Sequence, residues 1–201
     1  MKGGEVLKEI GLFMKKICIF NQKGGVGKTT TNINLCAYLA MEGYRVLTID
    51  IDPQGNTTSG LGLDKRSLQS SMYDVITSDV SLKDVIIKSE LVPNLSIAPS
   101  TMELAGAEIE VIGNSNRETI LLNKIKEIEE DYDFVFIDCP PSLGMLTINA
   151  LTTVESVLIP IQCEFYALEG VGQLMNTIQL MQKSLNKSLY IEGVIMTMYD
   201  Y

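Results

Sequence analysis

A glycine-rich segment that joins an apolar run to a helical pattern constrains the fold of this chain more than any other feature. Residues 17–20 are apolar and of strand length, and residues 30–41 carry apolar side chains at helical spacing. Between them lie Lys23, Gly24, Gly25, Val26, Gly27, Lys28, Thr29 and Thr30. Glycines let the backbone curl so that successive N–H groups point at phosphate oxygens, and the helix that follows adds the positive end of its dipole. The segment therefore predicts a phosphate-binding loop between a strand and a helix.

Two side chains of this loop carry the chemistry expected there. Lys28 supplies a point charge for the β- and γ-phosphates of a nucleotide, and the hydroxyl of Thr29 is a ligand for magnesium. The alternative is a glycine-rich turn with an incidental lysine. The fixed positions of Gly-Gly-x-Gly-Lys-Thr, placed between a strand and a helix, favour the phosphate loop over that alternative.

Further apolar runs alternate with amphipathic segments along the rest of the chain. Strand-sized runs occupy residues 45–49, 95–98, 134–137, 157–161 and 191–197, and helical patterns occupy residues 119–130 and 168–185. Continuous apolar strands that alternate with helices predict an α/β fold. We expect a doubly wound, mostly parallel sheet with helices on both faces, in three layers. Functional residues of such a fold gather at the carboxyl ends of the strands.

Acidic residues follow two of these strands, at the edge where the functional residues are expected. Asp50 and Asp52 come after the run of residues 45–49, and Asp138 follows residues 134–137. Carboxylates two positions apart can face one pocket if the chain leaves extended geometry at Pro53. Asp138 is placed to bind magnesium, usually through water. The alternative for these aspartates is a role as caps or turn residues, but their nearness to the loop favours a nucleotide site.

Composition excludes several kinds of chemistry. The chain has 201 residues, enough for one domain with a sizeable core. It has no histidine, so either any base that acts at neutral pH is a carboxylate or no strong base is needed. A net charge of −9 argues against a chain wrapped in nucleic acid. The apolar runs are too short to span a membrane and no export signal opens the chain, so we expect a cytoplasmic protein. The cysteines are scattered, which indicates small apolar fillers rather than a metal site or a disulfide framework: Cys18, Cys36, Cys139 and Cys163.

The loop departs from the usual phosphate-loop pattern in a way that resembles one family. Gln22 stands where the first glycine of Gly-x-x-x-x-Gly-Lys-Thr belongs, and a second lysine, Lys23, follows it. This deviant Walker A form is typical of the ParA/MinD group of ATPases. Residues 52–56, 138–144 and 162–170 together resemble the Soj/ParA-type chromosome- and plasmid-partitioning ATPases.

The resemblance implies a role for individual residues. It implies that Lys23 reaches across a dimer interface to the partner's nucleotide, that Asp52 orients the attacking water, and that Asp50 lies close to the magnesium shell. Residues 23–30 are then the nucleotide-binding segment. The catalytic residues implied are Lys23, Lys28 and Asp52, and the metal ligands implied are Thr29, Asp50 and Asp138.

The resemblance also implies cofactors, partners and extent. It implies that the cofactors are ATP and Mg2+ and that an ATP-dependent nucleotide-sandwich homodimer hydrolyses ATP slowly, stimulated by a partner. The partner implied is a ParB-like protein, and no membrane partner is implied. The protein would associate with the nucleoid when ATP is bound. We expect residues 1–13 to be a flexible N-terminal extension and residues 14–201 to be a P-loop ATPase domain that lacks its C-terminal part. Many of the family's DNA-binding basic residues lie in that part, so non-specific DNA binding is expected of a full-length member rather than of this chain.

Alternative functions remain beside this one. A MinD-like membrane-associated positioning ATPase needs an amphipathic C-terminal helix, and residues 164–170 favour the partitioning branch over it. A truncated fragment that binds ATP and partners without hydrolysis is a further alternative, and phosphate release from the purified chain separates it from an enzyme. A nitrogenase iron protein is a poor match, because the chain lacks the cysteine pattern that binds the iron–sulfur cluster of that family. Only Cys139 lies near the expected position of a cluster ligand.

Overall fold

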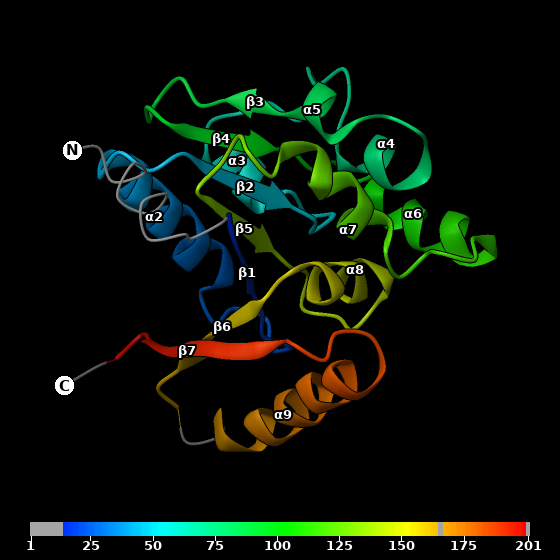
Figure 1. The fold of residues 1–201 in the computed structure, drawn as a ribbon. Helices are drawn as coiled ribbons and strands as arrows, with labels where there is room; N and C mark the ends of the chain where they lie inside the picture. Colours follow the sequence, from blue (N-terminus) through cyan, green and yellow to red (C-terminus); the bar gives the residue numbers. More distant parts are fainter. Residues whose placement is uncertain (1–13, 165–166, 200–201) are drawn as a thin grey trace.

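A seven-stranded sheet forms the centre of the computed structural model, which describes residues 14–164 and 167–199 (Figure 1). Its strands are β1 (Lys15–Ile19), β2 (Val46–Asp50), β3 (Ile87–Lys88), β4 (Leu95–Ala98), β5 (Phe134–Asp138), β6 (Ser156–Gln162) and β7 (Tyr190–Thr197). Their order across the sheet is β3-β4-β2-β5-β1-β6-β7, and all neighbours are parallel except the short β3 against β4. The strand before the glycine-rich loop, β1, therefore lies inside the sheet between β5 and β6.

Helices cover both faces of this sheet. They are α2 (Lys28–Met41), α3 (Asn56–Gly60), α4 (Met72–Thr77), α5 (Leu82–Val85), α6 (Leu104–Glu110), α7 (Ile120–Ile125), α8 (Met145–Thr153) and α9 (Ala167–Ser184), with 3-10 turns η1 (Val111–Gly113) and η2 (Lys126–Ile128). Figure 1 shows α2 on one side of the strands and α7 and α8 on the other. The predicted α/β class, with a mostly parallel sheet between two helical layers, is confirmed.

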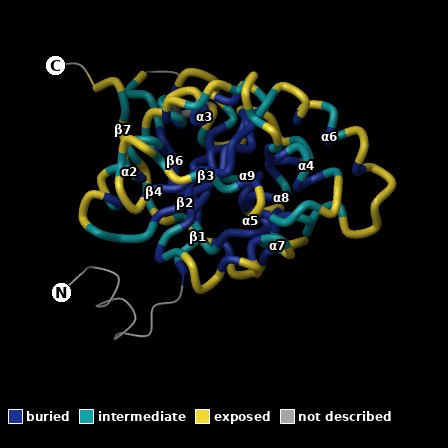
Figure 2. The backbone as a smooth tube through the Cα atoms, turned by 90° about the horizontal axis from the view of Figure 1, so that it is seen from above, coloured by how far each residue is buried: buried dark blue, intermediate teal, exposed yellow. Residues whose placement is uncertain are grey.

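Alternate side chains of the strands enter two separate apolar clusters. In β5, Val135 and Ile137 join the cluster under α4 and α6 to α9, whereas Phe136 joins the cluster under α2. Every residue of β2 is buried, which explains why the strands are continuous apolar runs rather than alternating ones. The buried strands fill the middle of the molecule in Figure 2.

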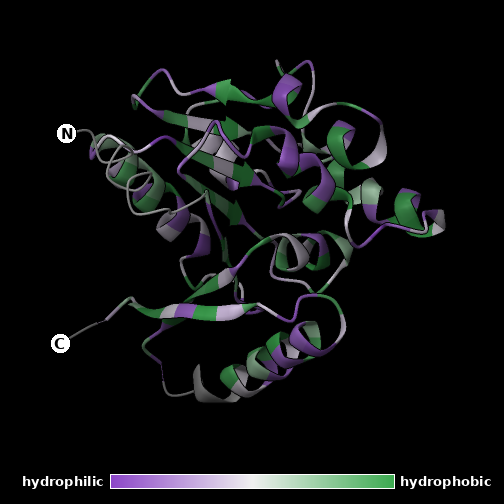
Figure 3. Ribbon diagram, viewed as in Figure 1, coloured by the Kyte–Doolittle hydropathy of each residue, from purple (hydrophilic) through white to green (hydrophobic). Residues whose placement is uncertain are grey.

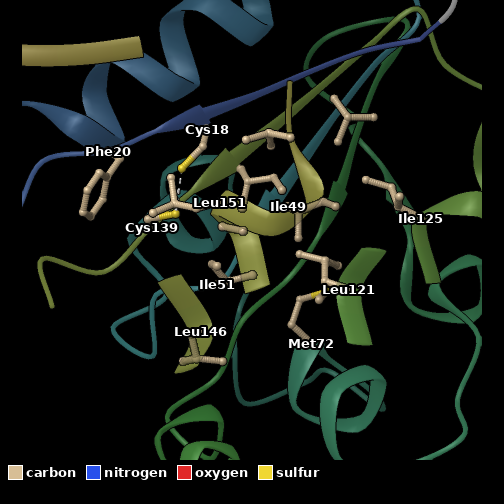
Figure 4. Packing of buried hydrophobic residues seen from close by; sticks show 14 of the residues in the cluster. Cys18, Phe20, Ile49, Ile51, Met72, Leu121, Ile125, Cys139, Leu146 and Leu151 are labelled. Atoms are coloured by element: carbon tan, nitrogen blue, oxygen red, sulfur yellow. Dashed lines mark hydrogen bonds between the residues drawn. The ribbon is translucent and has the colours of Figure 1, made fainter. Parts of the chain in front are cut away.

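A dense part of the larger cluster lies directly beneath the loop that follows β5 (Figure 4). There Cys18 of β1 and Cys139 are both fully buried, and their Sγ atoms are 3.0 Å apart in a thiol–thiol hydrogen bond. Burial raises the pKa of the Cys139 thiol, so it stays neutral. Three of the cysteines are buried, as expected for apolar fillers, and Cys163 is half-buried.

The sequence patterns located the strands better than the helices. The pattern of residues 119–130 is α-helical only to Ile125 and continues as η2, while the helix expected from Thr30 begins at Lys28. Helix α8 was not predicted, because most of its side chains are buried and it has no polar face to give a helical stripe. The expected extension, residues 1–13, lies outside the described residues. Within the described part, no helix is long and apolar enough to cross a membrane.

We expect Leu121→Ala to lower the free energy of unfolding by about 2–5 kcal/mol, because it would leave a cavity at a fully buried position of α7. The matched control is Leu180→Ala on α9, where the leucine is 58% exposed and the change should stay within about 0.5 kcal/mol. Urea unfolding followed by circular dichroism measures both. Equal losses from the two variants would contradict the assignment of α7 to the core.

Candidate phosphate-binding site

The glycine-rich loop joins β1 to α2 and takes a backbone path that needs its glycines. Gly25 and Gly27 have φ values of 74° and 87°, in the left-handed region that side chains with a Cβ rarely adopt. Gly27 is the N-cap of α2 and offers no side chain to satisfy the first N–H groups of the helix. These N–H groups therefore stay available at the positive end of the helix dipole, as an anion site requires.

The strands on the α9 side of β1 hold this loop in place. The side chain of Asn21 donates to the carbonyl of Pro160 in β6 at 2.8 Å and accepts from the N–H of Lys23 at 3.0 Å. The hydroxyl of Thr197, at the end of β7, donates to the carbonyl of Val26 at 2.9 Å. The loop is thus fixed from β6 and β7 as well as by its own ends.

An open cavity of about 360 Å³ lies over the loop. Six of the eight residues expected to bind nucleotide line it, together with Asp52 of the first acidic segment and Pro141 of the second: Gly24, Gly25, Gly27, Lys28, Thr29 and Thr30. Val26 is 1% exposed and its side chain belongs to the interior. Larger hollows occur elsewhere on the surface, but the glycine-rich loop does not line them.

Lys28 is held under this cavity. Its side chain is largely buried, and its Nζ donates to the carbonyl of Lys23 at 3.1 Å. Burial lowers the pKa of Lys28, and the carboxylates of Asp138 and Asp52 partly oppose that shift. A phosphate bound in the cavity would add negative charge beside this cation and favour its charged form.

Asp138 has the polar surroundings of a cation ligand. Its Oδ2 accepts hydroxyl hydrogen bonds from Thr29 at 2.8 Å and from Thr57 at 2.7 Å. Its Oδ1 is buried and, among the described residues, has no hydrogen-bond partner. Burial raises the pKa of Asp138 to about 6, and the two hydroxyls oppose the rise. A buried carboxylate oxygen without a partner costs free energy, which a bound cation or its water would recover.

This donor set fits magnesium. Mg2+ prefers oxygen ligands and keeps waters and substrate phosphates in its shell, and the Thr29 hydroxyl and the Asp138 carboxylate are oxygen donors on the same side of the loop. No three His, Cys, Asp or Glu side chains in the described part of the chain are placed together to hold a metal. The remaining ligands would therefore come from phosphate and water.

Asp50 and Asp52 occupy different environments although they are two positions apart. Asp50 is fully buried opposite Asp138 and accepts hydrogen bonds from Thr58 N–H, Thr58 Oγ1 and Asp52 N–H. Burial, aided by the charge of Asp138, raises the pKa of Asp50 to about 7. Asp52 lines the cavity, and its Oδ1 accepts from the N–H of Gln54 at 2.9 Å. Neither Asp50 nor Asp138 lines the cavity, and the two lie side by side on neighbouring strands, so the place of Asp50 near a magnesium shell stays a prediction.

Lys23 points away from the cavity to the neighbouring segment after β6. Its Nζ lies 2.9 Å from Oε2 of Glu164, and both side chains are more than 40% exposed. An exposed ion pair of this kind contributes about 0–1 kcal/mol, so it can exchange for another partner. Phe165 and Tyr166 of the same segment lie outside the described residues.

The structure adds site residues that the sequence did not single out. The hydroxyl of Thr57 donates to Asp138, and the hydroxyl of Thr58 donates to Asp50. The two threonines are adjacent and come directly after the acidic segment, so their position in the sequence could have identified them as site residues. Thr197 and Met198 reach the loop only because β7 pairs with β6. The predicted strand of residues 191–197 ends at Thr197, but no local pattern shows that this end lies beside the loop.

Comparison with known proteins agrees with this geometry. A family profile described as an AAA domain matches residues 14–191. The chain is 56% identical to the sporulation initiation inhibitor protein Soj of Bacillus subtilis, over 92% of this chain and 73% of that protein. It is 48% identical to the chromosome partitioning protein ParA of Myxococcus xanthus, over 92% of this chain and 65% of that protein. The chain thus spans only part of the length of these relatives.

A solved structure shares the fold of this chain. Cobyrinic acid a,c-diamide synthase of Mycobacterium smegmatis matches with a TM-score of 0.89 at 40% identity, over 93% of this chain and 76% of that one. That protein was crystallised with ADP and magnesium and with an ATP analogue and magnesium. The fold of this chain is therefore shared with a protein that binds adenine nucleotide and magnesium.

We expect Asp138→Asn to stabilise the nucleotide-free protein at pH 8 by about 1–3 kcal/mol. The amide keeps an oxygen for Thr29 and Thr57 and removes a buried charge. The pKa of Asp138 in the folded chain, about 6, lies above its ordinary value of 3.8. At a pH between 3.8 and about 6, folding is therefore accompanied by uptake of a proton. The free energy of unfolding of the wild type falls as the pH rises through this range.

The gain from Asp138→Asn should consequently shrink as the pH is lowered from 8 to 4. Urea unfolding at several pH values, without nucleotide or magnesium, measures it. Glu90→Gln, at an exposed carboxylate, is the matched control, and the difference between the two variants is followed against pH. A gain that is the same at every pH would show that the Asp138 charge is not the cause.

Proposed function

This chain belongs to the Soj/ParA family of chromosome-partitioning ATPases, and on that premise we propose that it binds ATP with magnesium and hydrolyses ATP to ADP and phosphate in DNA segregation. One observation carries the proposal. The glycine-rich loop with its buried Lys28, Asp52 and Pro141 all line one cavity. Asp138 bonds Thr29 of this lining and has, among the described residues, a buried carboxylate oxygen without a hydrogen-bond partner.

The residues divide the work between binding and turnover. The N–H groups of the loop and the Lys28 ammonium hold the β- and γ-phosphates, and Thr29 and Asp138 hold magnesium, with Asp50 near them. Bound magnesium would neutralise negative charge on the phosphates. Asp52, at the cavity wall, orients the attacking water. With no histidine in the chain, positioning of this water by a carboxylate replaces imidazole base catalysis.

Lys23 acts on the nucleotide of a second protomer in an ATP-dependent sandwich dimer. Its position supports this role, because the exposed pair with Glu164 leaves it near the loop but outside its own cavity. ATP favours the dimer to the extent that it binds the dimer more tightly than the monomer. A ParB-like partner stimulates the slow hydrolysis and so ends the dimeric state.

We do not assign DNA binding to the residues of this chain. A net charge of −9 with 16 lysines and arginines leaves little basic surface for phosphate contacts. We assign non-specific DNA binding, and location on the nucleoid in the ATP state within the cytoplasm, to the full-length relative. The higher identity to Soj than to the diamide synthase favours partitioning over amide synthesis.

Lys28→Ala should abolish ATP binding, because the loop loses its buried cation while its N–H groups remain. Isothermal calorimetry with Mg-ATP measures the loss. Lys187→Ala, an exposed lysine beyond α9, is the matched control and should bind as the wild type does. Retention of affinity within about threefold, or roughly 0.65 kcal/mol, would refute the role of the loop.

Lys23→Ala and Asp52→Ala should each bind ATP and each lose turnover, for different reasons. Lys23→Ala removes a charge given to the partner's nucleotide, so it should also fail to dimerise with ATP, whereas Asp52→Ala should accumulate the dimer. Phosphate release and light scattering measure the two effects. Absence of phosphate release from the wild type itself would favour a binding protein without hydrolysis.

Mixing the two variants tests action across the interface. A heterodimer has one nucleotide site with an intact Asp52 that also receives an intact Lys23, so part of the activity should return. If heterodimers form and no activity returns, Lys23 does not act in trans as an independent site.

A further inference from the structure

A tight turn over residues 52–55 holds Asp52 at the wall of the phosphate cavity, and we call it the Asp52 turn. The N–H of Gly55 donates to the carbonyl of Asp52 at 2.8 Å, and the N–H of Gln54 donates to Oδ1 of Asp52 at 2.9 Å. Asp52, Gln54 and Asn56 line the cavity. The direction of the Asp52 carboxylate therefore depends on the conformation of this turn.

The core side of the Asp52 turn is fixed by the segment that follows β4. Ser100 is fully buried there, and its hydroxyl donates to the same carbonyl of Asp52 at 2.8 Å. The N–H of Ser100 donates to the hydroxyl of Thr58 at 2.9 Å, and that hydroxyl donates to Asp50. A Cβ on Gly55 would lie 2.9 Å from the carbonyl oxygen of Ser100, and Gly55 has a φ of 60°. The turn thus lies directly against this segment and requires glycine at its last position.

The outer side of the Asp52 turn is covered by Lys65. Its Nζ donates to the carbonyl of Gln54 at 2.7 Å. A Cβ on Gly55 would lie 2.7 Å from Cδ of Lys65, so the aliphatic part of the lysine packs against this glycine. Lys65 lines the neighbouring hollow rather than the phosphate cavity. The lysine therefore contacts the back of the turn and not the space that a nucleotide would fill.

The backbone at Lys65 is ordered by a turn of its own. The N–H of Ser67 and the hydroxyl of Ser67 both donate to the carbonyl of Asp64, at 3.0 and 2.8 Å. The side chain of Lys65 is half-buried, whereas that of Arg66 is 93% exposed and pairs with Asp64. Two adjacent cations thus differ in that one is bound to the Asp52 turn and the other lies in solvent.

Polar contacts fix this region of the chain. Helix α3 follows the Asp52 turn directly, and Figure 3 shows pale or hydrophilic colour on it beside largely hydrophobic strands. One hydrogen bond contributes about 0.5–1.5 kcal/mol net. Loss of the bond from Lys65 would therefore let the turn populate other conformations, in which the Asp52 carboxylate faces the cavity less often.

We propose that Lys65 is a positioning residue for Asp52. Its hydrogen bond to the Gln54 carbonyl keeps the Asp52 turn in the conformation that directs the carboxylate to the attacking water. This inference rests on the proposed function for its effect on hydrolysis, whereas the effect of Lys65 on the turn is measured without nucleotide.

The kinetic test compares Lys65→Met, which loses the donor, with Arg66→Met, which loses the adjacent exposed cation. Phosphate release from the 201-residue chain is followed over a range of Mg-ATP concentrations. We expect Lys65→Met to lower kcat about fivefold and to change KM by less than about twofold, because the turn loosens while the phosphate loop stays intact. Arg66→Met should leave both constants unchanged. Lys65→Arg, which restores a donor and the charge, should recover most of kcat.

Hydrogen exchange of single amides, followed by NMR without nucleotide, tests the turn itself. The amides of Gln54 and Gly55 should exchange about fivefold faster in Lys65→Met than in the wild type. Arg66→Met and Lys65→Arg should show wild-type rates. The amide of Ile49, a fully buried residue of β2, should exchange at the same rate in every variant and so report that the fold is intact.

Three results would overturn the proposal. They are unchanged exchange of the Gln54 and Gly55 amides in Lys65→Met, a raised KM with unchanged kcat, which would make Lys65 a nucleotide-binding residue, and equal losses in Lys65→Met and Arg66→Met, which would indicate surface charge. Absence of phosphate release from the wild type would instead refute the proposed function. The amide exchange would then decide by itself whether Lys65 holds the turn.

Discussion

Burial of charge at one edge of the sheet is the constraint on which the rest of this structure depends. Asp50 and Asp138 are almost completely buried next to each other, and Asp52 and Lys28 are no more than 9% exposed. Removal of an ion from water costs several kcal/mol even after the protein relaxes. The chain offsets this cost with hydroxyl and N–H donors, and burial still raises the pKa of Asp50 and of Asp138. A site of this kind favours ligands that bring both a cation and phosphate.

The parallel sheet brings the functional side chains together at this edge. Because β1 lies between β5 and β6, the loop after β1 is beside the loop after β5 on one flank and beside the segment after β6 on the other. The first flank supplies Asp138 to Thr29, and the second supplies Pro160 to Asn21. Each contact joins residues more than 100 positions apart in the sequence. Loss of the strand order would therefore remove the site even if every motif stayed intact.

The sequence predicted those parts of this arrangement that rest on local rules. Glycines before a helix predicted the phosphate loop, and apolar runs ending at Asp50 and Asp138 predicted strands with acidic ends at one edge. The rest depends on packing between distant segments. Thr197 contacts the loop only through the pairing of β7 with β6, and Glu108 reaches α8 only because α6 folds back over the same face. Glu108 stands in no pattern that periodicity or turn chemistry could identify, and the predicted strand that ends at Thr197 does not itself show which strand it pairs with.

The two lysines of the loop show how burial separates functions within one motif. Lys28 is fixed by the walls of the cavity and by the carbonyl of Lys23, so its charge is available only to a ligand in its own site. Lys23 is on the surface, and its pair with Glu164 holds it by about 1 kcal/mol at most. Exchange of Glu164 for another anionic partner would therefore cost little free energy. The same sequence motif thus contains one buried lysine in the cavity and one lysine on the surface, and the difference comes from exposure rather than from residue type.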